Sequence, residues 1–108
     1  MHTVEYHKTF TGSLSVPETA FELKVYNNIS TAIHAVSDDA ATVVKTQYCF
    51  TDPVTKAVTA VDYDTLTMSS ANTLYVANYQ YKIDHMRVVV TATGSGGGTI
   101  RITGNVAS

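Results

Sequence analysis

Hydrophobic and polar residues alternate along most of the chain, and a period of two predicts β-strands. In residues 20–26, Phe21, Leu23 and Val25 alternate with charged residues. A helix over residues 15–23 is the competing interpretation, because Ser15 offers capping chemistry, but the alternation favours a strand. By the same pattern we expect strands at 4–10, 20–26, 30–36, 42–50, 56–62, 74–81, 86–93 and 99–103, with residues 64–70 ambiguous.

The C-terminal stretch carries the strongest strand pattern. Residues 86–93 and 99–103 are both rich in β-branched side chains, and the small residues Gly94–Gly98 join them. This arrangement predicts a β-hairpin. Because Val88, Val89 and Val90 are apolar on both faces, we expect the hairpin to be central in its sheet.

A second hairpin is predicted around Pro53. Residues 42–50 and 56–62 are strand-like, and Thr51–Thr55 between them has the composition of a turn. Proline suits the second position of a type I turn because its ring fixes the backbone angle required there.

The number and spacing of these segments predict the fold class. Seven or eight short strands at intervals of about 8–12 residues, separated by turn signals, are typical of an all-β protein. We therefore expect a single antiparallel β-sandwich or jelly-roll-like domain over residues 1–108. Residues 1–12 are either its first strand or an N-terminal arm that docks on a neighbouring molecule.

Composition and charge narrow the classes of partner. The formal net charge is −2 and charged residues make up 15% of the chain, against about 25% in ordinary globular proteins. Such a balance argues against a nucleic-acid partner. No apolar run approaches the length of a membrane helix and no signal peptide is visible, so we expect no membrane partner and synthesis in a cytoplasm.

Candidate catalytic and metal-binding residues form no recognisable motif. The histidines, at positions 2, 7, 34 and 85, are scattered, and Cys49 is the single cysteine. Calcium ligation by Asp38–Asp39 or Asp62–Asp64 is the less favoured interpretation, because adjacent acids are common in turns. The glycine run lacks the lysine and the helix that follow a phosphate loop. We expect no enzymatic activity, no cofactor and no bound metal.

Tyrosines are the remaining candidate functional residues. Tyr75, Tyr79 and Tyr81 share one face of a predicted strand, where they would form a carbohydrate platform, a protein interface or an ordinary core wall. The first strand adds apolar and aromatic residues that could dock on a neighbour. The candidate interaction residues are Val4, Tyr6, Phe10, Tyr75, Tyr79 and Tyr81.

The C-terminal residues also resemble a known group of proteins. The sequence from Tyr81 to Thr91, followed by the glycine-rich turn and Thr99–Ile102, is similar to the C-terminal half of small β-sandwich virion proteins of tailed bacteriophages. The resemblance covers about the last thirty residues and carries no catalytic residue. It implies a structural virion protein, in particular a capsid decoration (cement) protein that binds the major capsid protein on the outer surface of the head.

The sequence also leaves alternative functions open and predicts an oligomeric state. A head-fibre or tail component and a carbohydrate-binding β-sandwich are the alternative functions, and a small hydrolase has less support. We expect a homo-oligomer on the capsid, because few charges and many Thr and Tyr residues leave strand faces that one small core cannot cover. A trimer is favoured because the resembling cement proteins often occupy three-fold sites.

Overall fold

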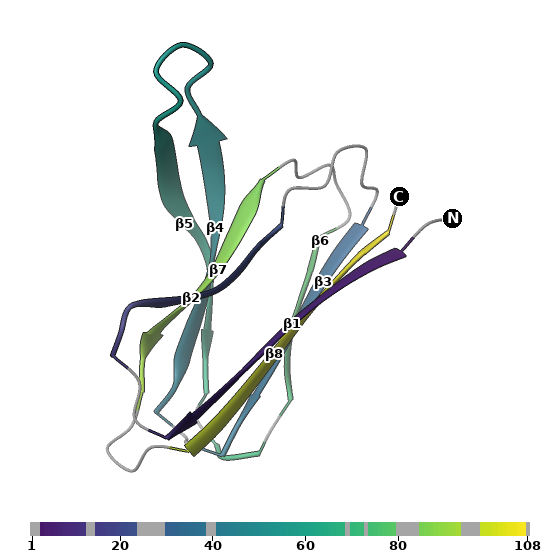
Figure 1. Ribbon diagram of the computed structural model, residues 1–108. Coiled ribbons are helices and arrows are strands. Elements are labelled where there is room, and N and C mark those ends of the chain that lie inside the picture. Colours follow the sequence, from purple (N-terminus) through teal and green to yellow (C-terminus); the bar gives the residue numbers. More distant parts are fainter. Residues whose placement is uncertain are drawn as a thin grey trace.

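Eight antiparallel strands form two sheets in the computed structural model, which describes residues 3–12, 15–23, 30–38, 41–68, 70–72, 74–79, 85–93 and 98–107. The two sheets lie face to face (Figure 1). Sheet A contains, in spatial order, β1 (Thr3–Gly12), β8 (Gly98–Ala107), β3 (Ser30–Ser37) and β6 (Tyr75–Tyr79). Sheet B contains β2 (Glu18–Leu23), β7 (Met86–Ala92), β4 (Val43–Thr51) and β5 (Val58–Thr67).

The strand pairing is that of a jelly roll. Strand β1 pairs with β8, β2 with β7, β3 with β6 and β4 with β5, as in a long two-stranded ribbon wound so that successive pairs fall in alternate sheets. The predicted all-β, antiparallel sandwich is therefore confirmed. Residues 18–23 are a strand, so the helix interpretation of that segment is wrong.

The predicted C-terminal hairpin is wrong, although both of its strands exist. Strand β7 lies in sheet B between β2 and β4, whereas β8 lies in sheet A between β1 and β3. The chain segment between them therefore connects two sheets. Both strands are nevertheless central, as expected from Val88–Val90, whose side chains are all buried.

The first strand is an integral part of sheet A. All ten residues of β1, Thr3–Gly12, pair with β8, from Thr3 opposite Ala107 to Gly12 opposite Gly98. Of the two interpretations of this segment, the strand is the one observed. Docking of this segment on a neighbouring molecule stays a prediction.

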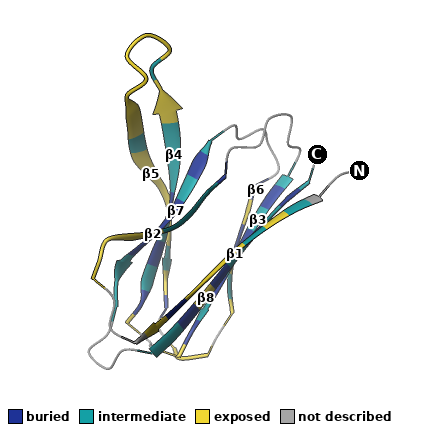
Figure 2. Ribbon diagram, in the orientation of Figure 1, coloured by how far each residue is buried: buried dark blue, intermediate teal, exposed yellow. Residues whose placement is uncertain are grey.

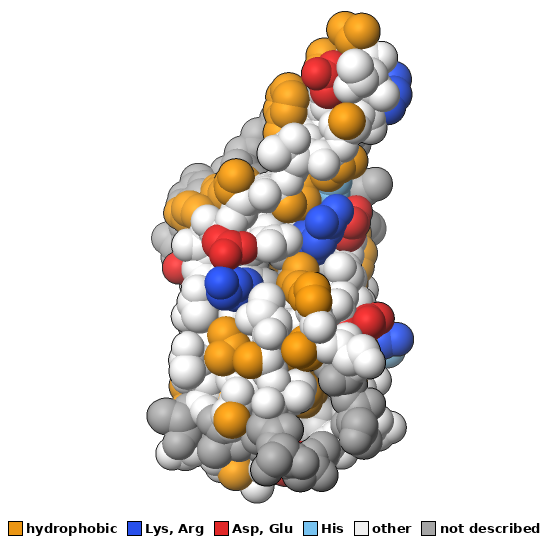
Figure 3. Space-filling model, turned by 90° about the vertical axis from the view of Figure 1, so that its left-hand side faces the viewer, with side chains coloured by type: hydrophobic (Ala, Val, Ile, Leu, Met, Phe, Trp, Pro, Cys, Tyr) orange, Lys and Arg blue, Asp and Glu red, His pale blue; other side chains and the backbone are white. Residues whose placement is uncertain are grey.

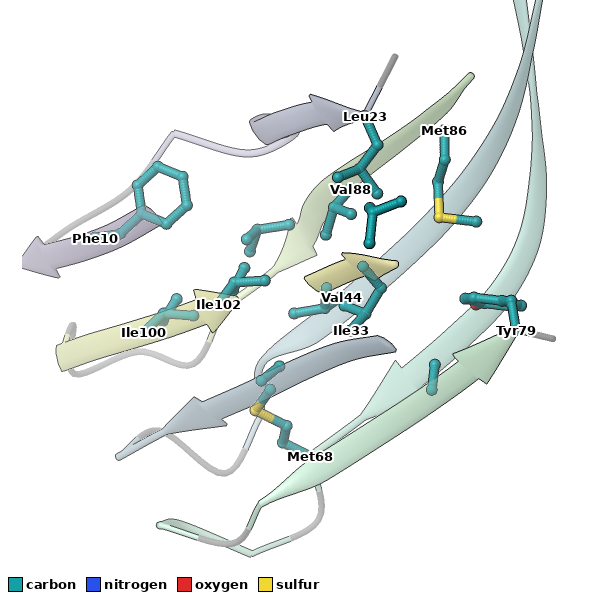
Figure 4. Close-up of a cluster of buried hydrophobic side chains, with 14 residues drawn as sticks. Phe10, Leu23, Ile33, Val44, Met68, Tyr79, Met86, Val88, Ile100 and Ile102 are labelled. Carbon is teal, nitrogen blue, oxygen red and sulfur yellow. The ribbon is translucent and has the colours of Figure 1, made fainter. Parts of the chain in front are cut away.

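The core is made by the inward faces of both sheets. Residues of alternate parity are buried in β3 and β8, and the same alternation places Val44, Met86, Val88 and Val90 inside from sheet B. Figure 4 shows side chains of both sheets meeting between the layers, among them Ile33, Val44 and Met86. Burying one such aliphatic side chain contributes about 1.5–3 kcal/mol, so this packing is the main source of stability.

The β4–β5 hairpin projects beyond the sandwich (Figure 1). It is the predicted hairpin, with β5 extended to Thr67 so that it includes most of the ambiguous segment 64–70. Figure 2 shows that the projecting part is mostly exposed. The end of this hairpin is therefore accessible to a partner.

Candidate functional site

The tip of the β4–β5 hairpin is held in a defined shape by Asp52. Its Oδ1 accepts hydrogen bonds from the backbone N–H of Val54 (2.8 Å) and of Thr55 (3.1 Å). These bonds hold the pKa of Asp52 below its ordinary value. The Lys56 N–H donates to the Asp52 carbonyl (2.9 Å), and Lys56 adopts a left-handed backbone with φ of 66°. The tip thus presents Val54 on an ordered loop, with its side chain 86% exposed.

Exposed hydrophobic side chains continue from the tip along one face of the hairpin. Phe50 is 62% exposed and Val61 is 58% exposed. Because Phe50 pairs with Thr59 and Tyr48 with Val61, both exposed residues lie on the same face of the ribbon. Figure 3 shows hydrophobic side chains along the projecting end of the molecule.

This apolar face is the continuation of the core-facing side of sheet B. Val44 and Thr46, which have the same parity as Phe50 on β4, are fully buried. Their side of the strand is covered within the sandwich, but the strand continues past the end of that cover. Phe50 and Val61 on this face, together with Val54 at the tip, form the hairpin patch, which is therefore a candidate interaction surface.

Three tyrosines join the base of the hairpin to the sandwich. The rings of Tyr48 and Tyr63 meet edge to face with centroids 4.6 Å apart, and the ring of Tyr79 lies 5.5 Å from that of Tyr63. The Tyr79 hydroxyl is within hydrogen-bond distance of Thr46 Oγ1 (2.6 Å) and of Asp64 Oδ2 (2.8 Å). Burial raises the pKa of Tyr79 well above its ordinary value, so the hydroxyl stays protonated and donates.

The outer face of sheet B carries two groups of paired charges. Glu22 accepts hydrogen bonds from His85 Nε2 (3.1 Å) and Arg87 Nε (3.0 Å). The His85 contact, opposed by partial burial and assisted by Arg87, lowers the pKa of Glu22. Lys45 Nζ lies 3.0 Å from Asp62 Oδ2. In both groups each carboxylate pairs with a basic side chain of a neighbouring segment. We therefore interpret both groups as structural networks.

Most of the predicted interaction residues lie elsewhere than expected. Phe10 and Tyr79 are 9% and 2% exposed, so the prediction that they contact a partner is wrong: their side chains point between the sheets. Tyr75 is half-buried against the same core, and its face of β6 is a core wall. Val4 is half-buried, and Tyr6 stacks on Phe21 with ring centroids 5.9 Å apart. Tyr81 lies outside the described residues.

The hairpin patch was missed because its residues follow the ordinary strand alternation. Phe50 has the same parity as Val44, so the sequence places it on a core face. The available signal was Pro53, which fixes the position of the turn and therefore the length of the ribbon. Length alone does not show where the opposing sheet ends.

The acidic and sulfur-containing residues occupy ordinary structural positions. Asp62 pairs with Lys45, and Asp64 accepts from Tyr79, which accounts for two of the acids considered for calcium. Cys49 is half-buried rather than fully buried in β4. Within the described ranges, no group of three or more His, Cys, Asp or Glu side chains is arranged to hold a metal ion. The described part of the chain also contains no helix long and apolar enough to cross a membrane.

Comparison with known proteins gives a likeness of fold. No protein-family model matches the chain, and no curated protein is a significant sequence match. A solved chain from Bacillus endospore appendages, described as a novel family of disulfide-linked pili, has a similar structure with a TM-score of 0.52 and 11% identity. The match covers 98% of this chain and 87% of that one. At this identity the likeness shows a shared β-sandwich fold.

Proposed function

We propose that this chain is a non-enzymatic structural protein that acts by binding other proteins in a multi-copy assembly. The observation that carries the proposal is the hairpin patch: an ordered loop and strand pair that presents Phe50, Val54 and Val61 to solvent. Patches of this kind on a small domain are typical of interaction sites. Both strands of the hairpin belong to sheet B and Asp52 holds its turn, so docking of the patch should cost little conformational entropy.

The specific assembly that we propose is the head of a tailed bacteriophage, with this chain as a decoration protein on the capsid outer surface. The resemblance of residues 81–102 to small virion β-sandwich proteins supports this assignment. The partner would be the major capsid protein, contacted by the hairpin patch. Each copy needs to bury only a modest area, because many copies on one shell multiply a weak contact.

Binding to capsid shells tests this function. Purified protein is mixed with shells assembled without it and sedimented, and the bound protein is counted per major capsid protein. We expect saturation at a fixed ratio and loss of binding when Phe50→Ser and Val54→Ser are combined. Val76→Ser is the matched control, because Val76 is an exposed valine on β6 of sheet A. Absence of saturable binding by the folded wild type would refute the decoration function.

A subunit of a protein fibre is the second candidate, and the structural likeness to a pilus protein supports it. In that case the hairpin patch would dock on another copy of the chain. Negative-stain electron microscopy of the concentrated protein distinguishes the two functions. Regular fibres formed without any capsid protein would favour the fibre subunit, whereas their absence together with saturable shell binding would favour the decoration protein.

A further inference from the structure

The outer part of strand β5 has an unprotected edge. Among the described residues, only β4 pairs with it, so the other side of its backbone is open. Edge strands usually carry a protective feature such as shortness, irregular register or charge. The other edges have one: β6 is five residues long, β2 has a register shift after Thr19, and β1 carries Glu5 and Lys8. The inner part of β5 is protected in the same way, by a register shift between the charged residues Asp62 and Asp64. The outer part of β5, Val58–Val61, is uncharged and contains neither Pro nor Gly.

The open edge offers backbone groups at alternate residues. The Asp52 N–H donates to the Ala57 carbonyl at the closed end of the hairpin (2.8 Å). Antiparallel pairs alternate between residues directed at their partner and residues directed away from it. Counting from Ala57, the backbone groups of Thr59 and Val61 are directed toward β4. Those of Val58 and Ala60 are directed outward, where another strand can reach them.

Charges along this edge are arranged for self-recognition. Asp62 lies on β5, three residues after Thr59, and Lys56 lies in the turn, three residues before Thr59 and two before β5 begins at Val58. If two copies of the edge run antiparallel with Thr59 opposite Thr59, each Lys56 comes opposite the Asp62 of the other copy. A parallel, in-register pairing would instead place Lys56 opposite Lys56 and Asp62 opposite Asp62, which is unfavourable.

We propose that β5 of one molecule pairs with β5 of a second copy, antiparallel and centred on Thr59. The two B sheets then form one continuous sheet across a two-fold axis. Val58 faces Ala60 of the other copy, and the two Lys56–Asp62 contacts close the ends of the paired segment. Both side chains have capacity for this contact. The Lys56 ammonium has three donors, one of which is used by the Pro53 carbonyl (3.0 Å), and a carboxylate accepts more than the two bonds that Asp62 receives from Lys45 and Gln47.

The pairing also places the two hairpin patches side by side. Val61 and Phe50 lie on the same face as Thr59. The two-fold axis therefore brings this apolar face of one copy next to that of the other. A two-fold contact of this type is closed and yields dimers. The dimer would be the building unit of the proposed assembly. The biological role of this dimer rests on the proposed function.

Charge reversal provides the sharpest test. Sedimentation velocity over a range of concentrations measures the dimer dissociation constant of the wild type, of Lys56→Glu and of Asp62→Lys. Each variant places like charges opposite each other twice, so we expect its dissociation constant to rise about tenfold or more. An equimolar mixture restores both pairs and should dimerise nearly as well as wild type. Lys8→Glu, the same reversal on the other sheet's edge, should leave dimerisation unchanged.

A backbone test covers the case in which Asp62→Lys fails to fold. Ala60→Pro removes an outward N–H, which an edge strand tolerates, and should give a folded monomer, whereas Ala60→Val should remain dimeric. A monomeric wild type, or a dimer that survives both Ala60→Pro and Lys56→Glu, would overturn the pairing. Shell sedimentation is read separately. A dimer that does not bind shells refutes the decoration function and leaves the pairing intact. A monomer that binds shells refutes the pairing and leaves the decoration function intact.

Discussion

The Tyr79 hydroxyl donates a 2.8 Å hydrogen bond to Asp64 Oδ2 and thereby joins the edge strands of the two sheets. The same oxygen lies 2.6 Å from Thr46 Oγ1, and Thr46 is fully buried. Because the tyrosine proton is committed to the carboxylate, the threonine hydroxyl donates to the tyrosine oxygen. The Tyr79 side chain thus helps to fasten the strand pair that carries the hairpin patch to sheet A.

Removing this hydroxyl should loosen the base of the hairpin. Tyr79→Phe leaves the buried Thr46 hydroxyl without this partner, so we expect a loss of about 1–2 kcal/mol in the free energy of unfolding. Urea denaturation followed by circular dichroism measures the loss. Tyr6→Phe, on a half-exposed ring, is the control and should change stability by less than about 0.5 kcal/mol. Equal effects of the two changes would contradict the proposed role of Tyr79.

Gly104 is expected to tolerate no side chain. A Cβ at this position would lie 3.0 Å from Phe21 Cε1 and 3.3 Å from Ile33 Cδ1, between the two sheets. Gly104→Ala should therefore destabilise the protein by about 1–3 kcal/mol through overpacking. In a Phe21→Leu background, which removes the contacting ring, the same change should cost clearly less. Additive effects in the double mutant would show that the ring is not the obstacle.

Charges placed on the inward face of β7 should disrupt the core. Val88 and Val90 are both fully buried, so Val88→Asp and Val90→Asp should each cost at least about 3 kcal/mol. A loss of this size is a large part of the total stability of a small domain. The matched control is Val76→Asp, at an exposed valine of β6. Melting temperatures of the two β7 variants as high as that of the control would refute their burial.

Glu22 should contribute a pH-dependent part of the stability. Its pKa in the folded protein lies below the ordinary value of 4.5, chiefly because of the His85 hydrogen bond. A group with a lowered folded-state pKa stabilises the protein above its unfolded-state pKa and loses that contribution as the pH falls through the folded-state value. We expect Glu22→Gln to be less stable than wild type at neutral pH by up to about 1 kcal/mol.

Melting temperatures measured from about pH 7 to pH 3 provide the check. The difference between wild type and Glu22→Gln should shrink as the pH falls below about 4.5. Glu5→Gln, at an exposed carboxylate of β1, should instead follow the wild type throughout. A difference that is constant with pH would show that the carboxylate charge of Glu22 is not responsible.

The sequence by itself determined where the strands lie. Alternation with period two placed segments at all eight observed strands, and Pro53 placed the β4–β5 turn, because both signals depend on neighbouring residues only. The buried run Val88–Val90 also indicated a central strand. These features need no knowledge of which strands meet.

Only the tertiary structure decided which strands pair and which faces are covered. The two arms of a hairpin and two strands in opposite sheets have the same alternation, so β7 and β8 could not be assigned to different sheets from their residues. Phe50 and Val44 likewise share a parity, yet one is exposed and the other is fully buried. The difference arises because β4 extends past the end of the opposing sheet, and burial depends on that distant layer rather than on the local sequence.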